Sequence, residues 1–179
     1  GAVTASADAV AGAAESSSVT LMPSGETFAA GTHYIALLPT KFTAGFKVIY
    51  SKTGQMAVAK AEGEVEFPRK GGFDVTESTS NLTWLANPIM TEADLRAYFA
   101  NQAAFAGETA KLGQDIALQS AWTPVALTGL FDGQNYTISN LSVDSEDQTG
   151  AHYSSGLFGW VESHTEEDGH IKNVKISGA

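Results

Sequence analysis

The sequence of 179 residues contains no cysteine. This absence excludes disulfide bonds, zinc–thiolate sites and thiol nucleophiles, because each of them needs a Cys sulfur. Long apolar runs are also missing: none approaches the about 20 residues of a membrane-spanning helix, so we expect no transmembrane segment. The first residues lack the basic region and the apolar core of a signal peptide, and we expect an export signal to be absent from this sequence.

Charged residues are scarce, and basic ones are the scarcest. Asp, Glu, Lys and Arg make up 17% of the chain, against about 25% in an ordinary soluble domain. The surface must therefore rely on Ser, Thr, Asn, Gln and Gly, a balance that suits extracellular β proteins. Lys and Arg number 10 against 20 Asp and Glu, which leaves a net charge of −10. We expect neither nucleic acid nor an anionic membrane as a partner, because both would be repelled.

The polar and apolar patterning predicts an all-β chain with three parts. Residues 1–17 are rich in Ala and Ser, offer little to bury and are expected to be a flexible lead-in. Residues 18–88 alternate short apolar runs with turn residues, which predicts a small β-sandwich. Asn87-Pro88 marks the boundary to a second domain, 89–179. The strands expected in the first domain are 18–22, 32–38, 45–50, 55–59, 64–67, 73–77 and 81–85.

One helix is predicted at the start of the second domain. Thr91 is a good N-cap, and Glu92 and Asp94 place carboxylates in the first turn, where the helix dipole favours negative charge. Gly107 suits the end of this segment. The residues that share one face at helical spacing are Leu95, Tyr98, Phe99 and Gln102. We expect this face to cover the apolar end of the strands that follow.

The strands that follow the helix contain an internal repeat. Ile138–Val143 matches Ile171–Ile176 in the pattern aliphatic-x-Asn-aliphatic-x-aliphatic, 33 residues apart. Gly-Leu-Phe occurs at 129–131 and again at 156–158, 27 residues apart, so we expect six inserted residues within 162–168. The strands expected in this domain are 115–118, 122–127, 136–143, 156–161 and 171–177.

The coil of a solenoid explains this pattern. Ile138 would point inward, Asn140 would occupy a corner, and Leu141 and Val143 would point inward on the next side. Asn tolerates the left-handed conformation of a corner, and Asn140 and Asn173 stacked at one corner would form a ladder. Two unrelated hairpins with similar strands are the alternative. The positions assigned to the repeat are Gly129, Phe131, Asp132, Gly133, Ile138, Asn140, Leu141, Gly156, Leu157, Phe158, Gly159, Ile171, Asn173 and Val174.

Three segments of the second domain resemble the GLUG-motif repeat family: Trp122–Val125, Leu130–Leu141 and Gly156–Gly159. The resemblance covers about residues 90–179. Such repeats occur in large secreted bacterial proteins, including adhesins and proteases. The resemblance implies a right-handed parallel β-helix. We expect about two coils of it, with the helix as the cap over the apolar end of the first coil.

The first domain is similar to the C-terminal sandwich of fimbrillin-like proteins. The segments that carry this resemblance are Gly31–Thr40, Gly45–Val48 and Phe67–Arg69. Fimbrillin-like proteins are surface lipoproteins and pilus subunits of anaerobic gut and oral bacteria. The resemblance, which covers roughly residues 18–88, implies export to the bacterial cell surface and an adhesive or pilus-related role.

An acidic segment is the main candidate for ligand binding. Trp160 is followed by Glu162, Glu166, Glu167 and Asp168, and carboxylate oxygens of this kind bind Ca²⁺. The alternative is a solvated loop, because the segment lacks the regular acidic spacing of a dedicated calcium site. A second acidic cluster holds the side chains of Asp144, Glu146 and Asp147. We expect no resident cofactor.

Other candidate groups have simpler structural explanations. Asp132-Gly133-Gln134-Asn135 is either a cation loop or a tight turn, which Asp-Gly favours. His152, His164 and His170 are irregularly spaced and are expected on the surface. Asp115 and Asp132 are the only candidates in a strand-rich context for the pair of carboxylates that cleaves a glycosidic bond. Trp84, Trp122 and Trp160 would either stack on sugars or pack in the core, with Trp160 the best exposed candidate.

These patterns predict a non-catalytic adhesin or structural module, extracellular and attached to a bacterial cell surface. No strained Gly-x-Ser-x-Gly turn for a serine nucleophile is present. The partners expected are a host glycan, a matrix protein or another surface subunit, with self-association through the C-terminal coil. Two alternatives stay open: a carbohydrate-binding or polysaccharide-active β-helix, and the stalk of a larger secreted enzyme.

Overall fold

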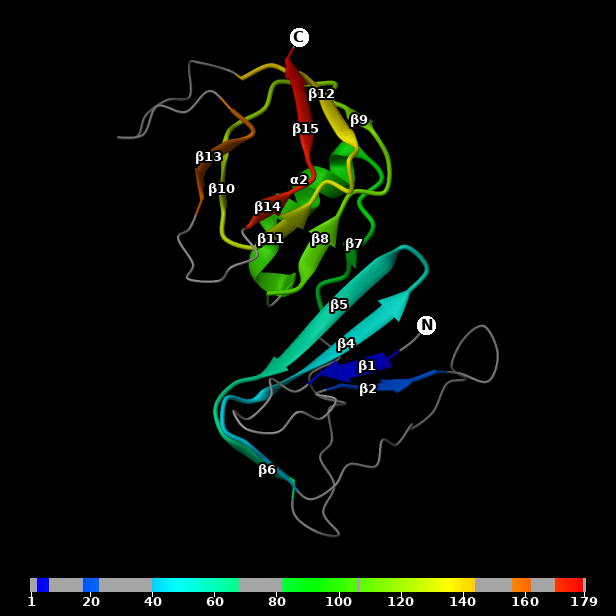
Figure 1. Ribbon diagram of the computed structural model, residues 1–179, viewed down its shortest axis with the longest axis vertical. Coiled ribbons are helices and arrows are strands. Elements are labelled where there is room, and N and C mark those ends of the chain that lie inside the picture. Colours follow the sequence, from blue (N-terminus) through cyan, green and yellow to red (C-terminus); the bar gives the residue numbers. More distant parts are fainter. Residues whose placement is uncertain are drawn as a thin grey trace. The chain divides into compact units, whose positions relative to one another are not determined.

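In the computed structural model the chain forms two compact units, Gly1–Trp84 and Leu85–Ala179. The residues that the structure describes are 3–6, 18–22, 40–67, 82–105, 107–143, 156–161 and 170–178. Strands dominate these residues, which contain one α-helix, so the prediction of an all-β protein is confirmed at this level (Figure 1). The predicted boundary at Asn87-Pro88 falls slightly beyond the division between the two units.

The first unit contains two antiparallel sheets among its described residues. One joins its strands in the order β2-β1-β4-β5, and the other pairs β3 with β6. The bounds are β1 Val3–Ser6, β2 Ser18–Leu21, β3 Thr40–Phe42, β4 Phe46–Lys52, β5 Gln55–Ala61 and β6 Val65–Phe67. Four of the expected strands are therefore present, at 18–22, 45–50, 55–59 and 64–67. The expected strands at 32–38 and 73–77 lie outside the described residues.

Part of the expected lead-in belongs to this sheet. Within 1–17, Val3–Ser6 forms β1 and pairs on one side with β2 and on the other with β4. The expectation of a flexible segment is therefore wrong for these four residues. Pairing on both sides gives their main-chain groups hydrogen-bond partners, and the β-branched Val3 and Thr4 favour strand geometry, although the segment has few large side chains.

The hairpin β4–β5 depends on two glycines. Gly54 adopts φ +68° in the tight turn between Lys52 and Gln55, a conformation that glycine adopts without steric cost. Gly45 adopts φ +84°, and a Cβ at this position would lie 1.9 Å from the carbonyl oxygen of Ala61. Only glycine therefore fits at Gly45.

From Thr109 onward, the strands of the second unit are parallel and lie in three sheets. The sheets have the orders β8-β11-β14, β9-β12-β15 and β10-β13. The bounds are β7 Leu85–Ala86, β8 Thr109–Lys111, β9 Ile116–Ala117, β10 Val125–Leu127, β11 Leu130–Asp132, β12 Thr137–Leu141, β13 Phe158–Val161, β14 Ile171–Lys172 and β15 Lys175–Gly178. Consecutive strands belong to different sheets, so the chain passes through the sheets in stacked layers: β8–β9–β10, then β11–β12–β13, then β14–β15 (Figure 1).

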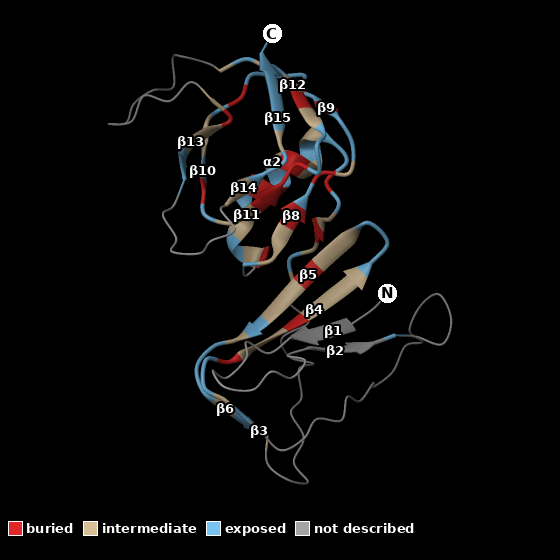
Figure 2. Ribbon diagram, viewed as in Figure 1, coloured by how far each residue is buried: buried red, intermediate tan, exposed pale blue. Residues whose placement is uncertain are grey.

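The core of the second unit is built from apolar residues that stack from layer to layer. Phe131 pairs with Ala110 on one side and Ile171 on the other. Ile138 lies between Ile116 and Ile176 in the same way. Phe131 and Ile138 in the middle layer are fully buried, whereas Ile176 in the third layer is 44% exposed. Figure 2 shows the contrast between β11, which is largely buried, and β15, which is exposed along its length.

This pairing corrects the register of the predicted repeat. Ile138 was expected to match Ile171, but Ile138 stacks on Ile176, and Ile171 stacks on Phe131. The two Gly-Leu-Phe motifs also differ in position, since Phe131 lies in β11 whereas Phe158 lies in β13 and pairs with Val125. The physical reason is a short turn between β14 and β15, which makes the second copy of the pattern span two strands.

The predicted helix is present as α2, Glu92–Ala100, but it ends at Ala100 and not near Gly107 as expected. Thr91 is the N-cap: its hydroxyl accepts from the main-chain N–H of Asp94, and the Asp94 carboxylate accepts from the N–H of Thr91. This reciprocal arrangement satisfies two main-chain donors of the first turn. A short 3-10 helix, η1 Gln102–Phe105, follows.

The apolar face of α2 packs on side chains from several strands. Leu95 and Tyr98 are completely buried and Phe99 is nearly so. The Phe99 ring lies 5.5 Å from Phe131 and 5.8 Å from Trp122, between ring centroids. Ring pairs at these separations add to the stabilisation from burial.

Polar side chains of the helical segment hold the loops of the first layer. The Glu92 carboxylate accepts from the main-chain N–H of Gln119 at 2.7 Å and from Arg96. The Gln102 amide oxygen accepts from the N–H groups of Thr128 and Gly129. Gln102, the polar member of the predicted face, therefore satisfies main-chain groups that would otherwise lack partners.

Candidate functional site

Asp132, at the end of β11, is the one charged residue that is buried among the described residues, with 5% of its surface exposed. One carboxylate oxygen, Oδ1, accepts from the main-chain N–H of Gln134 at 2.9 Å and from Asn173 Nδ2 at 3.1 Å. The other, Oδ2, accepts from Gln134 Nε2 at 2.6 Å and lies 3.9 Å from the ammonium of Lys172. The carboxylate therefore joins the turn after β11 to the turn after β14.

The surroundings of Asp132 favour its ionised form. Burial alone would raise the pKa of this carboxyl, but three hydrogen bonds and the charge of Lys172 outweigh burial and hold the pKa below its ordinary value. Of the two explanations for Asp132-Gly133-Gln134-Asn135, this geometry favours the tight turn, because protein donors already engage both carboxylate oxygens.

Asp132→Asn is expected to change how the stability of the second unit depends on pH. A carboxyl with a lowered pKa in the folded state stabilises the fold above its unfolded pKa of about 3.9 and loses this contribution as the pH falls through the folded pKa. Urea unfolding of the wild-type chain between about pH 6 and pH 2 should show this loss of unfolding free energy. In Asp132→Asn the part of the loss that comes from Asp132 should be absent.

Asp115→Asn is the control for this measurement. The Asp115 carboxylate is exposed and accepts one main-chain hydrogen bond, from Thr137 at 2.7 Å. Its replacement removes a carboxylate from the same unit and leaves Asp132 and its hydrogen-bond partners unchanged. An equal pH dependence in the wild-type chain and in Asp132→Asn would contradict the role assigned to Asp132.

Asn140 and Asn173 both adopt the left-handed conformation expected for a corner, with φ of 58° and 52°. The predicted ladder between them is wrong. Asn140 donates to the Leu118 carbonyl at 3.5 Å, whereas Asn173 donates to Asp132. Asn140 lies at an irregularity within β12, and Asn173 lies in the turn between β14 and β15, so the two occupy different corners.

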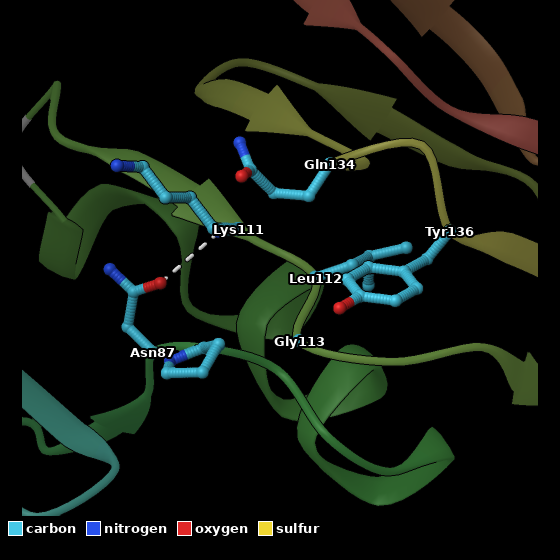
Figure 3. A pocket seen from close by; sticks show the side chains of 7 residues that line it. Asn87, Lys111, Leu112, Gly113, Gln134 and Tyr136 are labelled. Carbon is cyan, nitrogen blue, oxygen red and sulfur yellow. Dashed lines mark hydrogen bonds between the residues drawn. The ribbon is translucent and has the colours of Figure 1, made fainter.

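A pocket lies beside the Asp132 turn, with a volume of about 360 Å³. Its lining comes from three separate segments: Asn87, Pro88, Lys111, Leu112, Gly113, Gln134 and Tyr136 (Figure 3). The Asn87 side chain fixes one wall, because its oxygen accepts from the N–H of Lys111 and its nitrogen donates to the Thr109 carbonyl. The Tyr136 ring forms another wall and is 37% exposed.

The pocket was not predicted from the sequence. The only signal for it was an aromatic residue, Tyr136, directly after the polar turn that contains Gln134. Nothing local to Asn87 or Lys111 indicates that they approach this turn. Strand pairing brings Lys111 into register with Asp132, which places β8 beside the turn.

The three tryptophans differ in their surroundings. Trp122 is 1% exposed, donates from Nε1 to the Leu157 carbonyl at 2.9 Å and carries the Arg96 guanidinium over its ring. It therefore packs in the core. Trp84 is partly buried under the ammonium of Lys52. Trp160, on β13, is 52% exposed and is available for contact.

The acidic candidates Glu162, Glu166, Glu167 and Asp168 lie outside the described residues. So do Asp144, Glu146, Asp147, His152 and His164. His170 is described, and its Nδ1 lies 3.1 Å from the carbonyl oxygen of Gly129. Within the described ranges, no three His, Cys, Asp or Glu side chains gather into a group that could hold a metal ion.

No protein-family model, curated protein or solved structure matches this chain. A search of the described residues for membrane spans finds no helix with the length and apolar character to cross a bilayer.

Proposed function

We propose that the chain is a non-catalytic structural or adhesive module of a bacterial cell-surface protein. It combines a fimbrillin-like β-sandwich with a right-handed parallel β-helix of the GLUG type. The observation that carries this proposal is the layered, parallel pairing of β8 to β15, in which each sheet receives strands from successive passes of the chain. Such stacking builds a rigid support for surface residues on its outer faces.

Particular positions of the repeat support the β-helix assignment. At Gly133 a Cβ would lie 2.5 Å from the carbonyl oxygen of Asn173 and 2.5 Å from the Cα of Val174, so the close approach of two layers requires glycine. Asn135 and Asn173 supply left-handed corners, with φ of 67° and 52°. The burial of Tyr98 and Phe99 of α2 supports a capping role for the helix.

The surroundings of the two candidate carboxylates favour a non-catalytic role. Asp132 accepts three hydrogen bonds within its turn, and Asp115 accepts one from the main chain of Thr137. Catalytic acids of glycosidases face a substrate groove instead. We therefore assign both carboxylates to the structure of the turns.

The proposed partner is a host glycan or matrix protein at the extracellular surface. Trp160 supports this choice, because an exposed aromatic ring can stack on a sugar. A second surface subunit, including another copy of the chain, is the alternative partner. The exposure of Val161 at 38% and Ile176 at 44%, in β13 and β15, supports contact through these strands.

Binding of the intact chain to an array of glycans and matrix proteins tests the proposal, with and without Ca²⁺. We expect specific binding without cleavage of the bound glycan. Dependence on Ca²⁺ would assign a role to the acidic segment that contains Glu162 and Asp168. Sedimentation of the same sample measures self-association.

The outcomes of this test separate the functional classes. Cleavage of a sugar would overturn the non-catalytic role and would show that the chain is a polysaccharide-active enzyme. A blank array from a chain that associates would favour a structural subunit. A blank array from a strict monomer would rule out the adhesive role and favour the stalk of a larger enzyme. Trp160→Ala distinguishes sugar stacking by this ring from other modes of binding.

A further inference from the structure

The pocket beside the Asp132 turn has the mixed chemistry of a saccharide site. Pro88 and the Tyr136 ring are apolar, whereas Gln134 and Lys111 are polar (Figure 3). Sugars present the same combination, because a pyranose has an apolar face for an aromatic ring and hydroxyls for amide and ammonium groups. The hollow, of about 360 Å³, is open to solvent, so it would hold a saccharide along one side rather than enclose it.

Gln134 is held in place before any ligand arrives. It adopts φ +49°, a conformation that residues other than glycine seldom adopt. Asp132 holds both its main-chain N–H, at 2.9 Å, and its side-chain Nε2, at 2.6 Å. The side-chain oxygen of Gln134 is therefore fixed at the pocket as an acceptor for a hydroxyl.

Lys111 also lines the pocket and carries a positive charge, although its side chain extends away from Tyr136 in Figure 3. Among the residues that the structure describes, no carboxylate pairs with its ammonium. Asp132 is its neighbour in the sheet, but that carboxylate is engaged by Gln134, Asn173 and Lys172. In a chain of net charge −10, this unpaired cation is a local feature that favours an anionic ligand.

We infer that this pocket binds an anionic saccharide, with a sugar ring against Tyr136, a hydroxyl on the Gln134 oxygen and the sugar carboxylate on Lys111. The inference rests on the proposed adhesive function and gives it a ligand class and a site. Among the described residues, the other exposed aromatic is Trp160, which is followed closely in the sequence by Glu162. That neighbour disfavours an anionic sugar at Trp160.

Titration of the full chain with a uronic acid oligosaccharide, oligogalacturonate, tests the inference by NMR or calorimetry. We expect binding that weakens as the salt concentration rises from about 0.05 to 0.5 M, because salt screens exposed charges. Lys111→Gln and Tyr136→Ala should each weaken binding about tenfold, since each removes one main contact. The neutral methyl ester of the same oligosaccharide should bind the wild-type chain about tenfold more weakly.

One matched variant outside the pocket serves as the control, and a second tests the alternative site on β13. The control is Lys175→Gln, which removes another exposed lysine of the second unit and should bind oligogalacturonate as the wild type does. Trp160→Ala removes the exposed ring on β13. Lys111 and Tyr136 are exposed, so thermal unfolding of their variants should match the wild type within a few degrees and exclude misfolding as the cause of lost binding.

Each other result has a distinct meaning. Loss of binding only in Trp160→Ala would move the site to β13 and overturn the pocket while leaving the adhesive function. Equal affinity for the acid and its methyl ester would overturn the anionic class. If oligogalacturonate does not bind, the inference is wrong. A hit elsewhere on the glycan array would then preserve the proposed function, and a blank array from a strict monomer would remove it as well.

Discussion

Gly133→Ala is expected to lower the free energy of unfolding of the second unit by about 3 kcal/mol. A Cβ at Gly133 would lie 2.5 Å from two main-chain atoms of the next layer, the Asn173 oxygen and the Val174 Cα. Neither atom is free to move away. The N–H of Gly133 donates to the Lys172 carbonyl at 2.8 Å, and the N–H of Asn135 donates to that same Asn173 oxygen at 2.7 Å. Separation of the layers would break these bonds.

Gly156→Ala is the matched control for this prediction. Among the described residues its Cβ would meet no atom closer than 3.6 Å, and its φ lies outside the left-handed region. We expect a change within about 0.5 kcal/mol, which is usual for a site without a clash. Urea unfolding measures both free energies, and hydrogen exchange of the amides in β11 and β14 locates the effect. Equal stability of the two variants would show that the layers tolerate a side chain at Gly133.

The helix could be predicted from the sequence because its determinants are local. Thr91 and Asp94 cap each other within one turn, and Leu95 and Phe99 are four residues apart. These contacts form whatever the rest of the chain does. Short strands with alternating apolar residues, such as β4, were predictable for the same reason.

The register of the layers could not be predicted because it depends on loop length. Ile116 and Ile138 stack at an offset of 22 residues in the sequence, but Ile138 and Ile176 stack at an offset of 38. A search for a constant period therefore selects the wrong partner for Ile138. The true partner, Ile176, lies in a segment whose pattern resembles that of β12 at a different offset.

The first layer was also hard to recognise, which is why about two coils were expected where the chain forms three layers. Its strand β8 has Ala110 at the position that Phe131 and Ile171 occupy in the next layers. A small residue gives little hydrophobic signal. The pocket could not be predicted from the sequence for a related reason, because Asn87, Lys111 and Tyr136 come together only after the layers stack.

The second large loss of unfolding free energy is expected at Phe99, which packs near the layer that contains the small residue Ala110. Because Ala110 fills little of the first layer, rings from α2 reach the middle layer. Phe99 packs edge-on against Phe158 at 5.6 Å and contacts Phe131 at 5.5 Å, between ring centroids. Phe99→Ala is expected to cost about 3–5 kcal/mol of unfolding free energy, because it removes buried surface and leaves a cavity between helix and strands.

Phe99→Leu separates the loss of volume from the loss of ring contacts. Leucine refills most of the space, so we expect a cost of about 1–2 kcal/mol. Urea unfolding of both variants, followed by tryptophan fluorescence, measures the difference. Trp122 is a suitable reporter, because its ring lies 5.8 Å from Phe99, edge to face. If Phe99→Ala unfolds at the wild-type midpoint, α2 does not stabilise the layers, and the capping role proposed for it is wrong. If its cost instead falls in the expected range and Phe99→Leu recovers most of it, burial between helix and strands is the stabilising contribution, as a cap over stacked layers requires.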